Sequence, residues 1–385
     1  MTRITDDWLT GPAAQAVCAM LTDAGFQALF VGGCVRNTLL DVPISDIDIS
    51  TDATPDQVIE AARQAGFKSV PTGYDHGTVT VVVDHEPFEI TTFRKDVETD
   101  GRRAVVAFAK TAEEDAHRRD FTMNALYARP DGAIVDPLGG LADLRARYLR
   151  FIDNPEDRIR EDYLRILRFF RFHAHYGNPE GGLDAEGLAA VAANSAGLET
   201  LSNERVGSEM RKLLSAPDPS QSVASMVQTG VLAHVLPGAE ARFLPVLVHL
   251  EGQAGLTPNA MRRLTCLGGD GLKDRLRLSN GEVRTLDHLH EALAGTAGDA
   301  ELAYRLGDGL ARDVALLRAA MTDGQMPRGL NQRLTLGNGA RGRFPVSAQD
   351  LMPAFQGAAL GARLKTLEAR WIASDFALTK EELLA

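Results

Sequence analysis

The sequence has few of the features that mark membrane, secreted or metal-cluster proteins. Its 385 residues include three cysteines, and Cys18, Cys34 and Cys266 stand too far apart to provide a metal-binding spacing. No apolar run approaches the roughly 20 residues that a helix needs to cross a bilayer, and the polar N-terminal segment has no signal-peptide core. We therefore expect reduced thiols, no membrane partner and a cytoplasmic location.

The chain is also short of positive charge. It has 52 Asp and Glu residues against 41 Lys and Arg, which gives a net charge of −11 and argues against a protein that coats nucleic acid non-specifically. A local basic groove remains compatible with this balance, so the positions of the arginines decide whether RNA is a partner. The length predicts two to four domains rather than one core.

The first 135 or so residues alternate helix and strand signals. The polar segment from Asp96 to Arg103, which contains Asp100-Gly101, predicts a turn or mobile loop. Thr54-Pro55 supplies an N-cap followed by a proline at the first helical position. The predicted helices are 12–21 and 55–64, and the predicted strands, identified mainly by β-branched residues, are 29–31, 45–50, 78–83 and 87–93.

From about Leu141 onward the sequence shows no convincing strand. The fold class is therefore α+β, with a head of mixed sheet and helices followed by an all-helical remainder. Helices are predicted over 156–176, 184–194, 203–215 and 220–235 and in several stretches beyond 240, with a Gly/Arg/Pro loop at 336–345.

Asp46 and Asp48 give the strongest local signal. In a strand over 45–50 both side chains point to one face, and two adjacent carboxylates are tolerable mainly where a divalent cation bridges them. Oxygen ligands favour Mg²⁺, which binds one or two carboxylates together with substrate phosphates. Upstream, Gly32-Gly33 makes a tight turn before a helix, where backbone N–H groups can approach a phosphate. The combination predicts a bound nucleoside triphosphate; the alternative is an ordinary strand end and β-turn.

Glu89 lies on a later predicted strand and has two interpretations. It can share the face of the aspartates and act as a third acidic group or an outer-shell partner. It can equally be a solvated strand residue, and the sequence leaves both open.

Arg118-Arg119-Asp120 begins a segment with more polar function than a surface helix needs. It continues through Thr122 and Asn124. Guanidinium groups pair with phosphate oxygens, and Asp or Asn pairs with sugar hydroxyls. The alternative is an exposed helix start with Asp120 as its cap.

A second arginine-rich block runs from Glu161 to Arg171. On a helix, Arg165, Arg168 and Arg171 cover one sector, and Asp162 lies beside Arg165 at i, i+3. The planar donors of Arg and the acceptors of Asp match the Watson–Crick edge of a base. A solvated, salt-bridged helix face is the alternative.

Taken in order, these blocks resemble the class II tRNA nucleotidyltransferase and bacterial poly(A) polymerase family. The resemblance covers about residues 28–215, with a weaker element near Glu204-Arg205. It implies a nucleotidyltransferase-type head in residues 1–140, a helical neck in 141–215 that recognises the base, and a helical body and tail in 216–385 that bind the acceptor end and elbow of tRNA. The matching blocks are Gly32 to Arg36, Asp46 to Asp48, Arg118 to Ala125, Asp136 to Gly140 and Glu161 to Arg168.

The resemblance also implies individual roles. Asp46 and Asp48 would be the catalytic carboxylates and would bind two Mg²⁺ ions. Gly33, Arg36, Arg119 and Asp120 would contact the incoming nucleotide, the first two at its triphosphate group. The residues implied at its base are Asp162, Arg165, Arg168 and Arg171.

Two further features of the family have counterparts here. Its flexible loop, needed for the switch from C to A, corresponds to Asp96 to Arg103. Asn37 is a departure, because the family usually has Asp after the arginine; a salt bridge expected from that position is in doubt. Several arginines of the helical half are candidates for RNA phosphate contacts, although most are expected to be ordinary surface charges: Arg205, Arg211, Arg262 and Arg263.

The implied function is template-independent addition of CCA to tRNA 3′ ends from CTP and ATP, by two-metal nucleotidyl transfer with release of pyrophosphate. A poly(A) polymerase, or an enzyme that adds only CC or only A, is the nearest alternative. The polar loop segment favours CCA addition over the CC-adding form without settling the choice. A catalytically inactive RNA-binding protein is disfavoured because both aspartates are present, and a small-molecule nucleotidyltransferase would not need so long a helical remainder.

Overall fold

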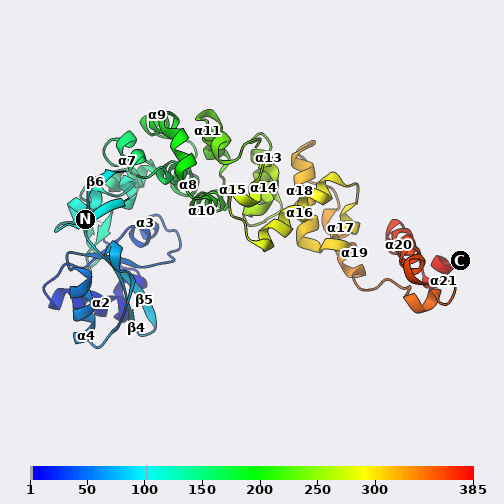
Figure 1. Ribbon diagram of the computed structural model, residues 1–385, viewed down its shortest axis with the longest axis horizontal. Helices are drawn as coiled ribbons and strands as arrows, with labels where there is room; N and C mark the ends of the chain where they lie inside the picture. The colour runs from blue at the N-terminus through cyan, green and yellow to red at the C-terminus, as the bar shows by residue number, and fades with distance from the viewer. Residues whose placement is uncertain (1–2, 101–102) are drawn as a thin grey trace. The chain divides into compact units, whose positions relative to one another are not determined.

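The computed structural model describes residues 3–100 and 103–385 of the chain (Figure 1). The described residues form two compact units. Unit 1 extends to Leu201 and also includes Gln228–His234, whereas unit 2 comprises Ser202–Val227 and Val235–Ala385. The predicted head and most of the predicted neck thus share unit 1. Their division at residue 140, and the boundary at 215, are divisions by function and stay predictions.

Unit 1 contains a seven-stranded sheet with the order β3-β4-β5-β2-β1-β8-β9. Neighbouring strands are antiparallel except β2 and β5, which run parallel. Helices α2 (Pro12–Asp23) and α4 (Pro55–Gln64) pack against β4 and β5 (Figure 1). The strands are β1 Leu29–Val31, β2 Asp48–Thr51, β3 Lys68–Gly73, β4 Thr78–Val83, β5 Glu86–Thr92, β8 Tyr127–Ala128 and β9 Ile134–Val135.

Local sequence explains these elements. Helix α4 begins with a complete capping box, in which Thr54 and Gln57 satisfy each other's backbone N–H groups, and Pro55 occupies the first turn. Strand β4 alternates half-buried threonine and valine with buried valine, as expected for one face on the core. The predicted helices at 12–21 and 55–64 and the predicted strands at 29–31, 78–83 and 87–93 are confirmed.

The predicted strand over 45–50 is only partly correct. Strand β2 starts at Asp48, so Asp46 lies in the preceding segment and not on the same strand face. Strand β1 pairs with Ile49 and Ser50, and β5 pairs with β2 from Asp48 onward. These strand pairings do not extend to residues 45–47, which explains why β2 begins late.

The described residues of the segment from Asp96 to Arg103 are in strands. Strands β6 (Arg94–Asp100) and β7 (Arg103–Phe108) form a separate antiparallel hairpin, with Asp100 opposite Arg103. The turn predicted at Asp100-Gly101 falls partly on residues 101–102, which lie outside the described residues.

An aromatic cluster joins the sheet side of unit 1 to helix α8 (Leu164–Tyr176). Phe121 and Phe151 have ring centroids 5.0 Å apart, and Phe151 stacks on Phe169 of α8 at 5.2 Å. All three are fully buried. The other helices are α1 Asp7–Thr10, α3 Gly33–Leu39, α5 Ala112–His117, α6 Gly140–Ala146, α7 Pro155–Glu161, α9 Ala185–Asn194 and α12 Val231–Val235, with 3₁₀ turns η1 Tyr74–His76, η2 Thr122–Asn124 and η3 Ser195–Thr200.

The helix predicted over 156–176 is two helices. Asp162 is extended, with φ −153° and ψ 104°, and ends α7. Its Oδ1 accepts a hydrogen bond from the N–H of Leu164 at 3.1 Å, so the side chain caps α8 and competes with helix continuation. The helix predicted over 220–235 is likewise divided, at Gly230, which has φ 75°.

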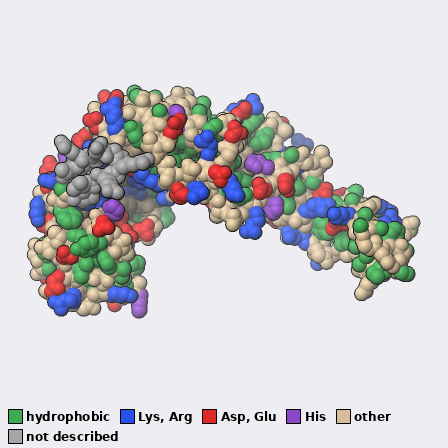
Figure 2. All heavy atoms as spheres, in the orientation of Figure 1, with side chains coloured by type: hydrophobic (Ala, Val, Ile, Leu, Met, Phe, Trp, Pro, Cys, Tyr) green, Lys and Arg blue, Asp and Glu red, His purple; other side chains and the backbone are tan. Residues whose placement is uncertain are grey.

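The described residues of unit 2 form helices joined by loops and contain no strand. One buried cluster includes Leu247, Leu289 and Leu316, and a second gathers around Trp371 near the C-terminus. On the face shown in Figure 2, acidic and basic side chains are interspersed along this part of the chain. The helices are α10 Asn203–Leu214, α11 Ser220–Gln228, α13 Leu244–Gln253, α14 Ala260–Leu267, α15 Leu272–Arg275, α16 Asn280–Ala294, α17 Asp299–Leu306, α18 Asp308–Ala320, α19 Leu330–Ala340, η4 Ala348–Leu351, α20 Gly357–Ala373 and α21 Lys380–Leu384.

Candidate functional site

The turn between β1 and α3 leaves its backbone open beside an arginine. Gly32 has φ 72°, and its N–H donates to the carbonyl of Leu126 at 3.2 Å. A Cβ built on Gly32 would lie 3.6 Å from Nη1 of Arg119, and one built on Gly33 would meet no heavy atom within 4 Å. The N–H of Gly32 is thus engaged, whereas Gly33, where α3 begins, has open space beside it close to the Arg119 guanidinium, which suits a phosphate group.

Carboxylates gather at the start of β2. Asp48 is opposite Glu89 in the parallel β2–β5 register, and Asp46 is exposed just before the strand. Burial raises the pKa of Asp48 to about 6, Glu89 and Asp46 add to this rise, and Arg119 opposes it. Asp46, Asp48 and Glu89 line a hollow of about 550 Å³.

This arrangement fits a divalent cation whose coordination is completed by phosphate groups of the substrate. A raised pKa means that the ionised form of Asp48 lacks a compensating positive charge, which a cation would supply. In the described part of the chain, no cluster of three or more acidic, His or Cys side chains could hold a metal by itself. Two carboxylates plus substrate phosphates are the usual Mg²⁺ ligand set.

Asp115, on α5, holds the arginine pair in place. Its Oδ1 accepts from Nε of Arg118 at 2.7 Å, and its Oδ2 accepts from Nη2 of Arg119 at 2.9 Å and from the hydroxyl of Tyr127 at 2.8 Å. Asp115 is fully buried, and although burial would raise its pKa, Arg119 and Arg118 lower it to about 2. The N–H of Arg94, where β6 begins, also donates to Oδ1.

Asp120 forms a second buried centre. Its Oδ2 accepts from Nε of Arg168 at 2.7 Å, and its Oδ1 accepts from Nδ2 of Asn124 at 3.0 Å. Burial would raise its pKa, but the nearby guanidinium of Arg168 and these hydrogen bonds lower it. Asp120 therefore joins its own segment to helix α8.

Arg36 extends this network. It is 6% exposed, and its Nη1 donates to Oδ1 of Asn124 at 2.5 Å. Its Nη2 donates to the hydroxyl of Tyr176 at 2.9 Å, and its guanidinium lies 4.1 Å from the centroid of that ring. Burial lowers the pKa of Arg36. In the ligand-free protein its donors are thus engaged by protein groups, and its contact with a nucleotide stays a prediction.

The arginine row of α8 is anchored at its N-terminal end. Nη1 of Arg165 donates to Glu161 at 2.5 Å and to the carbonyl of Arg158 at 2.8 Å, while Nη2 donates to the carbonyl of Arg118 at 2.9 Å. At the other end, Arg171 lies over Phe172 at 4.3 Å. The row is therefore held in a fixed orientation before any ligand binds.

The structure thus brings the predicted residues into two connected groups. Arg119 joins the glycine turn to the carboxylates, and Asp120 joins Arg36 and Arg168. Asp115 and Tyr127 support the first group and were not singled out from the sequence. Asn124 supports the second group and was predicted as a partner for a sugar hydroxyl. Asp115 stands three and four residues before the arginine pair on a helix, and this i, i+3 and i, i+4 spacing is the signal that would have found it.

Arg262 and Arg263 were predicted to be RNA contacts or surface charges, and both alternatives are wrong for them. Both are buried, at 4% and 1% exposure. They bind the two oxygens of Glu251 at 2.7 Å each, and Nη1 of Arg262 also binds Asp313 at 2.6 Å. Nη1 of Arg211 donates to the carbonyl of Leu276.

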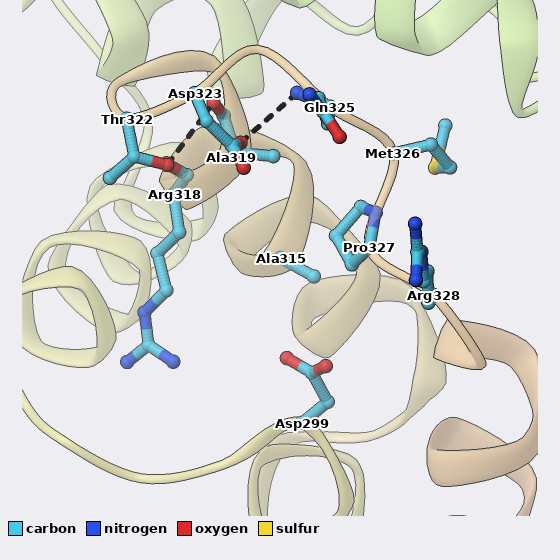
Figure 3. Close-up of a pocket in the computed structure, with 10 residues that line it drawn as sticks. All are labelled: Asp299, Ala315, Arg318, Ala319, Thr322, Asp323, Gln325, Met326, Pro327 and Arg328. Carbon is cyan, nitrogen blue, oxygen red and sulfur yellow. Dashed lines mark hydrogen bonds between the residues drawn. The ribbon is translucent and has the colours of Figure 1, made fainter.

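A second hollow, of about 390 Å³, lies in unit 2 (Figure 3). Arg318 and Asp299 line it, together with the exposed Arg328. Arg318 donates to the carbonyls of Ala292, Gly295 and Ala297. It therefore closes the C-terminal end of α16, a structural role.

Sequence comparisons place these features in a known context. Residues 28–150 match the family described as "Poly A polymerase head domain", and residues 183–243 match "Probable RNA and SrmB-binding site of polymerase A". The mouse protein "CCA tRNA nucleotidyltransferase 1, mitochondrial" is 33% identical over 374 residues, covering 92% of this chain and 85% of the relative. The "CCA-adding enzyme" of Limosilactobacillus fermentum is 33% identical, covering 96% and 95%.

Solved structures agree. The Bacillus stearothermophilus CCA-adding enzyme in complex with CTP has a TM-score of 0.71 at 28% identity, covering 94% of this chain and 93% of that one. The Thermotoga maritima CCA-adding enzyme complexed with tRNA also gives 0.71, at 19% identity over 100% and 98%, which is a likeness of fold. Among the described residues, no helix is long and apolar enough to cross a membrane.

Proposed function

This chain belongs to the family of CCA-adding tRNA nucleotidyltransferases, and we propose that it adds C, C and A to tRNA 3′ ends from CTP and ATP, releasing pyrophosphate. The observation that carries the proposal is the position of Arg119. Its guanidinium lies beside the Gly32 turn and is close enough to Asp48 to affect that carboxylate's pKa. A triphosphate bound at the turn would be next to the acidic hollow where nucleotidyl transfer requires a cation.

This geometry supports a catalytic role for the two aspartates. Family members depend on a divalent metal, which we assign as Mg²⁺; when bound, it lowers the pKa of the RNA 3′-hydroxyl and neutralises charge on the leaving pyrophosphate. Asp46 and Asp48 hold the metal. The register of Glu89 opposite Asp48 supports its interpretation as a third acidic group of this site.

The triphosphate is held by backbone and guanidinium groups. Gly33 offers open backbone, and Arg119 offers a charge that Asp115 keeps in a fixed orientation. Arg36 and Asp120 support the nucleotide from the network that they share with Asn124. Binding to such pre-oriented groups costs less conformational entropy than binding to mobile ones.

Helix α8 and its cap read the base. Asp162 supplies acceptors and Arg165 supplies donors for the Watson–Crick edge, and Arg168 and Arg171 complete the pocket. Glu161 and the Arg118 carbonyl hold Arg165 in a fixed orientation, which supports selection of C and A by these protein groups instead of by a nucleic-acid template. Residues 1–140 act as the head and 141–215 as the neck, while 216–385 bind tRNA by shape and backbone contacts, in the cytoplasm.

The decisive experiment uses purified protein, Mg²⁺ and tRNA transcripts ending at the discriminator base, at C or at CC. CTP, ATP or both are supplied, and product lengths are read on a sequencing gel. We expect three added nucleotides with both triphosphates, and no more. A long adenosine ladder would indicate a poly(A) polymerase, arrest after CC a CC-adding enzyme, extension of only the CC-ending transcript an A-adding enzyme, and no product on any RNA a binding protein.

Asp46→Ala provides the inactive control. Loss of several kcal/mol of metal-borne charge stabilisation corresponds to a rate decrease of about 10³-fold or more. Asp23→Ala, at the exposed end of α2, is the matched substitution and should retain full activity. Equal activity of both variants would remove Asp46 from the catalytic site.

A further inference from the structure

Asn37 follows Arg36 in helix α3, and its side chain contacts two parts of unit 1. Its Oδ1 accepts hydrogen bonds from Nε and Nη2 of Arg36, at 3.1 Å and 2.7 Å. Its Nδ2 donates to the backbone carbonyl of Pro43 at 2.8 Å. One amide group therefore touches the guanidinium and the segment that leads to Asp46.

Hydrogen-bond chemistry dictates the orientation of this amide. A guanidinium only donates and a peptide carbonyl only accepts, so the oxygen must face Arg36 and the nitrogen must face Pro43. An aspartate at position 37 could keep the contact with Arg36. It would, however, place a second carboxylate oxygen against the Pro43 carbonyl, where no donor would join the two acceptors.

On one side, Asn37 holds the start of the segment that carries Asp46. Its backbone carbonyl accepts hydrogen bonds from the N–H groups of Leu40 at 3.1 Å and Val42 at 2.9 Å. Together with the Pro43 contact, these bonds fix the chain from 40 to 43. Proline adds stiffness, because its ring restricts its own φ and the conformation of the residue before it.

On the other side, Arg36 connects Asn37 to helix α8. Its Nη2 is shared between Asn37 and the hydroxyl of Tyr176. Its guanidinium also lies 5.0 Å from the ring centroid of Phe172. Both aromatic residues are on the helix that carries the arginine row.

We propose that Asn37 is a positioning residue that ties the segment bearing Asp46 to helix α8, so that the cation-binding carboxylate keeps its place relative to the base-recognition helix. The inference rests on the proposed function for the roles of Asp46 and α8. The amide is needed because only a side chain with both an acceptor and a donor can bind the Arg36 guanidinium and the Pro43 carbonyl together.

The test separates the two contacts with Asn37→Asp, which keeps the Arg36 contact and loses the Pro43 contact. Hydrogen exchange is measured on the ligand-free protein, and single-turnover rates of C and A addition are measured with enzyme in excess. We expect about five-fold faster exchange over residues 40–47, as loss of one hydrogen bond allows. The maximal rate should fall about five-fold, with nucleotide affinities within about two-fold of wild type.

Two further variants complete the test. Asn37→Ala removes both contacts and should also accelerate exchange around Tyr176. Asn194→Asp removes a comparable amide-to-carbonyl bond, from Nδ2 to Ala190 at 2.8 Å on α9, and should change neither the exchange over 40–47 nor the rate.

The inference is overturned if Asn37→Asp matches Asn194→Asp in both readouts. Absence of CCA addition by the wild-type protein would refute the proposed function instead. The exchange measurement is independent of catalysis and still decides whether Asn37 holds the segment.

Discussion

Two pairs of adjacent arginines, Arg118-Arg119 in unit 1 and Arg262-Arg263 in unit 2, share one design. In each pair, a buried carboxylate binds one arginine through each of its oxygens. Asp115 binds the first pair at 2.7 Å and 2.9 Å, and Glu251 binds the second at 2.7 Å and 2.7 Å. The sequence alone gives no reason to treat the two pairs differently.

The pairs differ in what the guanidinium N–H groups that do not bind the carboxylate contact. In unit 2, Arg263 also donates to the carbonyls of Leu214 and Pro217, so its donors serve the fold. In unit 1, the side chains of Arg118 and Arg119 keep 17% and 18% exposure, and Arg119 faces the glycine turn. The comparison teaches that a carboxylate can pre-orient an arginine for a ligand only where the surrounding backbone leaves donors available.

The largest expected effect is on the stability of unit 2. Glu251→Gln leaves two buried guanidinium groups without their shared carboxylate, which costs about 3–5 kcal/mol for a buried pair. We expect this loss in the free energy of unfolding measured by urea titration. At low temperature, CCA addition per folded molecule should stay within about two-fold of wild type.

Glu240→Gln is the matched control, because Glu240 pairs with Arg242 at 2.9 Å on the surface. Exposed pairs contribute about 0–1 kcal/mol, so its stability should be nearly unchanged. Equal stability losses in the two variants would show that the Glu251 centre is not the support that its burial indicates.

The corresponding change in unit 1 should act on catalysis. Asp115→Asn removes the charge that orients Arg119, and we expect kcat/KM for CTP and ATP to fall about 10²-fold, equivalent to about 2.7 kcal/mol. The loss of stability should be smaller than for Glu251→Gln, because both arginines of this pair reach solvent.

Asp131→Asn tests whether any broken ion pair has this effect. Asp131 pairs with Arg3 at 3.2 Å, and both side chains are 57% exposed. Its kinetics should match wild type. An Asp115→Asn variant with normal kcat/KM would contradict the positioning role and make the two arginine pairs equivalent.

The smallest expected effect concerns pH. The folded-state pKa of Asp48 is raised by burial, Glu89 and Asp46 to about 6, against an ordinary value of 3.8. Between these values the folded protein binds more protons than the unfolded chain, so the stabilising contribution of Asp48 is complete below about pH 4 and is lost as pH rises through 6. Asp48→Asn should remove this slope, which is on the order of 1 kcal/mol per pH unit, from urea titrations of protein in the presence of a metal chelator.

Added Mg²⁺ should reverse the slope in the wild-type protein, because the cation binds the ionised carboxylate. It should have no such effect on Asp48→Asn. A wild-type curve identical to that of the variant would show that Asp48 is not held in a poorly compensated, buried position.

Much of the fold could be predicted from local chemistry. The capping box at Thr54 and the β-branched run at 78–83 specify their elements through neighbours in sequence, so they were predictable. The late start of β2 was not, because it depends on where β1 and β5 offer partners. The break at Asp162 depends on its choice between continuing one helix and capping the next, which side-chain periodicity does not reveal.

The same division applies to the candidate site. Asp46, Asp48 and the arginine blocks stand out because unusual residue types occur at short spacings. The convergence of Arg36, Asp120 and Arg168 was not predictable from spacing, since it joins segments up to 132 positions apart, counted from Arg36 to Arg168. The prediction for Arg262 and Arg263 was wrong because both side chains are buried, and a sequence does not show which charged residues face inward.

The aromatic stack of Phe121, Phe151 and Phe169 restricts how one protein can add two different nucleotides, C and A. These rings join the segment after the arginine pair to helix α8 through close contacts in the core, and such interiors resist gradual deformation. If the proposed function is correct, helix α8, which recognises the base, and the arginine pair, which holds the triphosphate, belong to one rigid body. The switch from adding C to adding A must then come from side-chain rearrangement within that rigid body or from parts outside it, such as the β6–β7 hairpin.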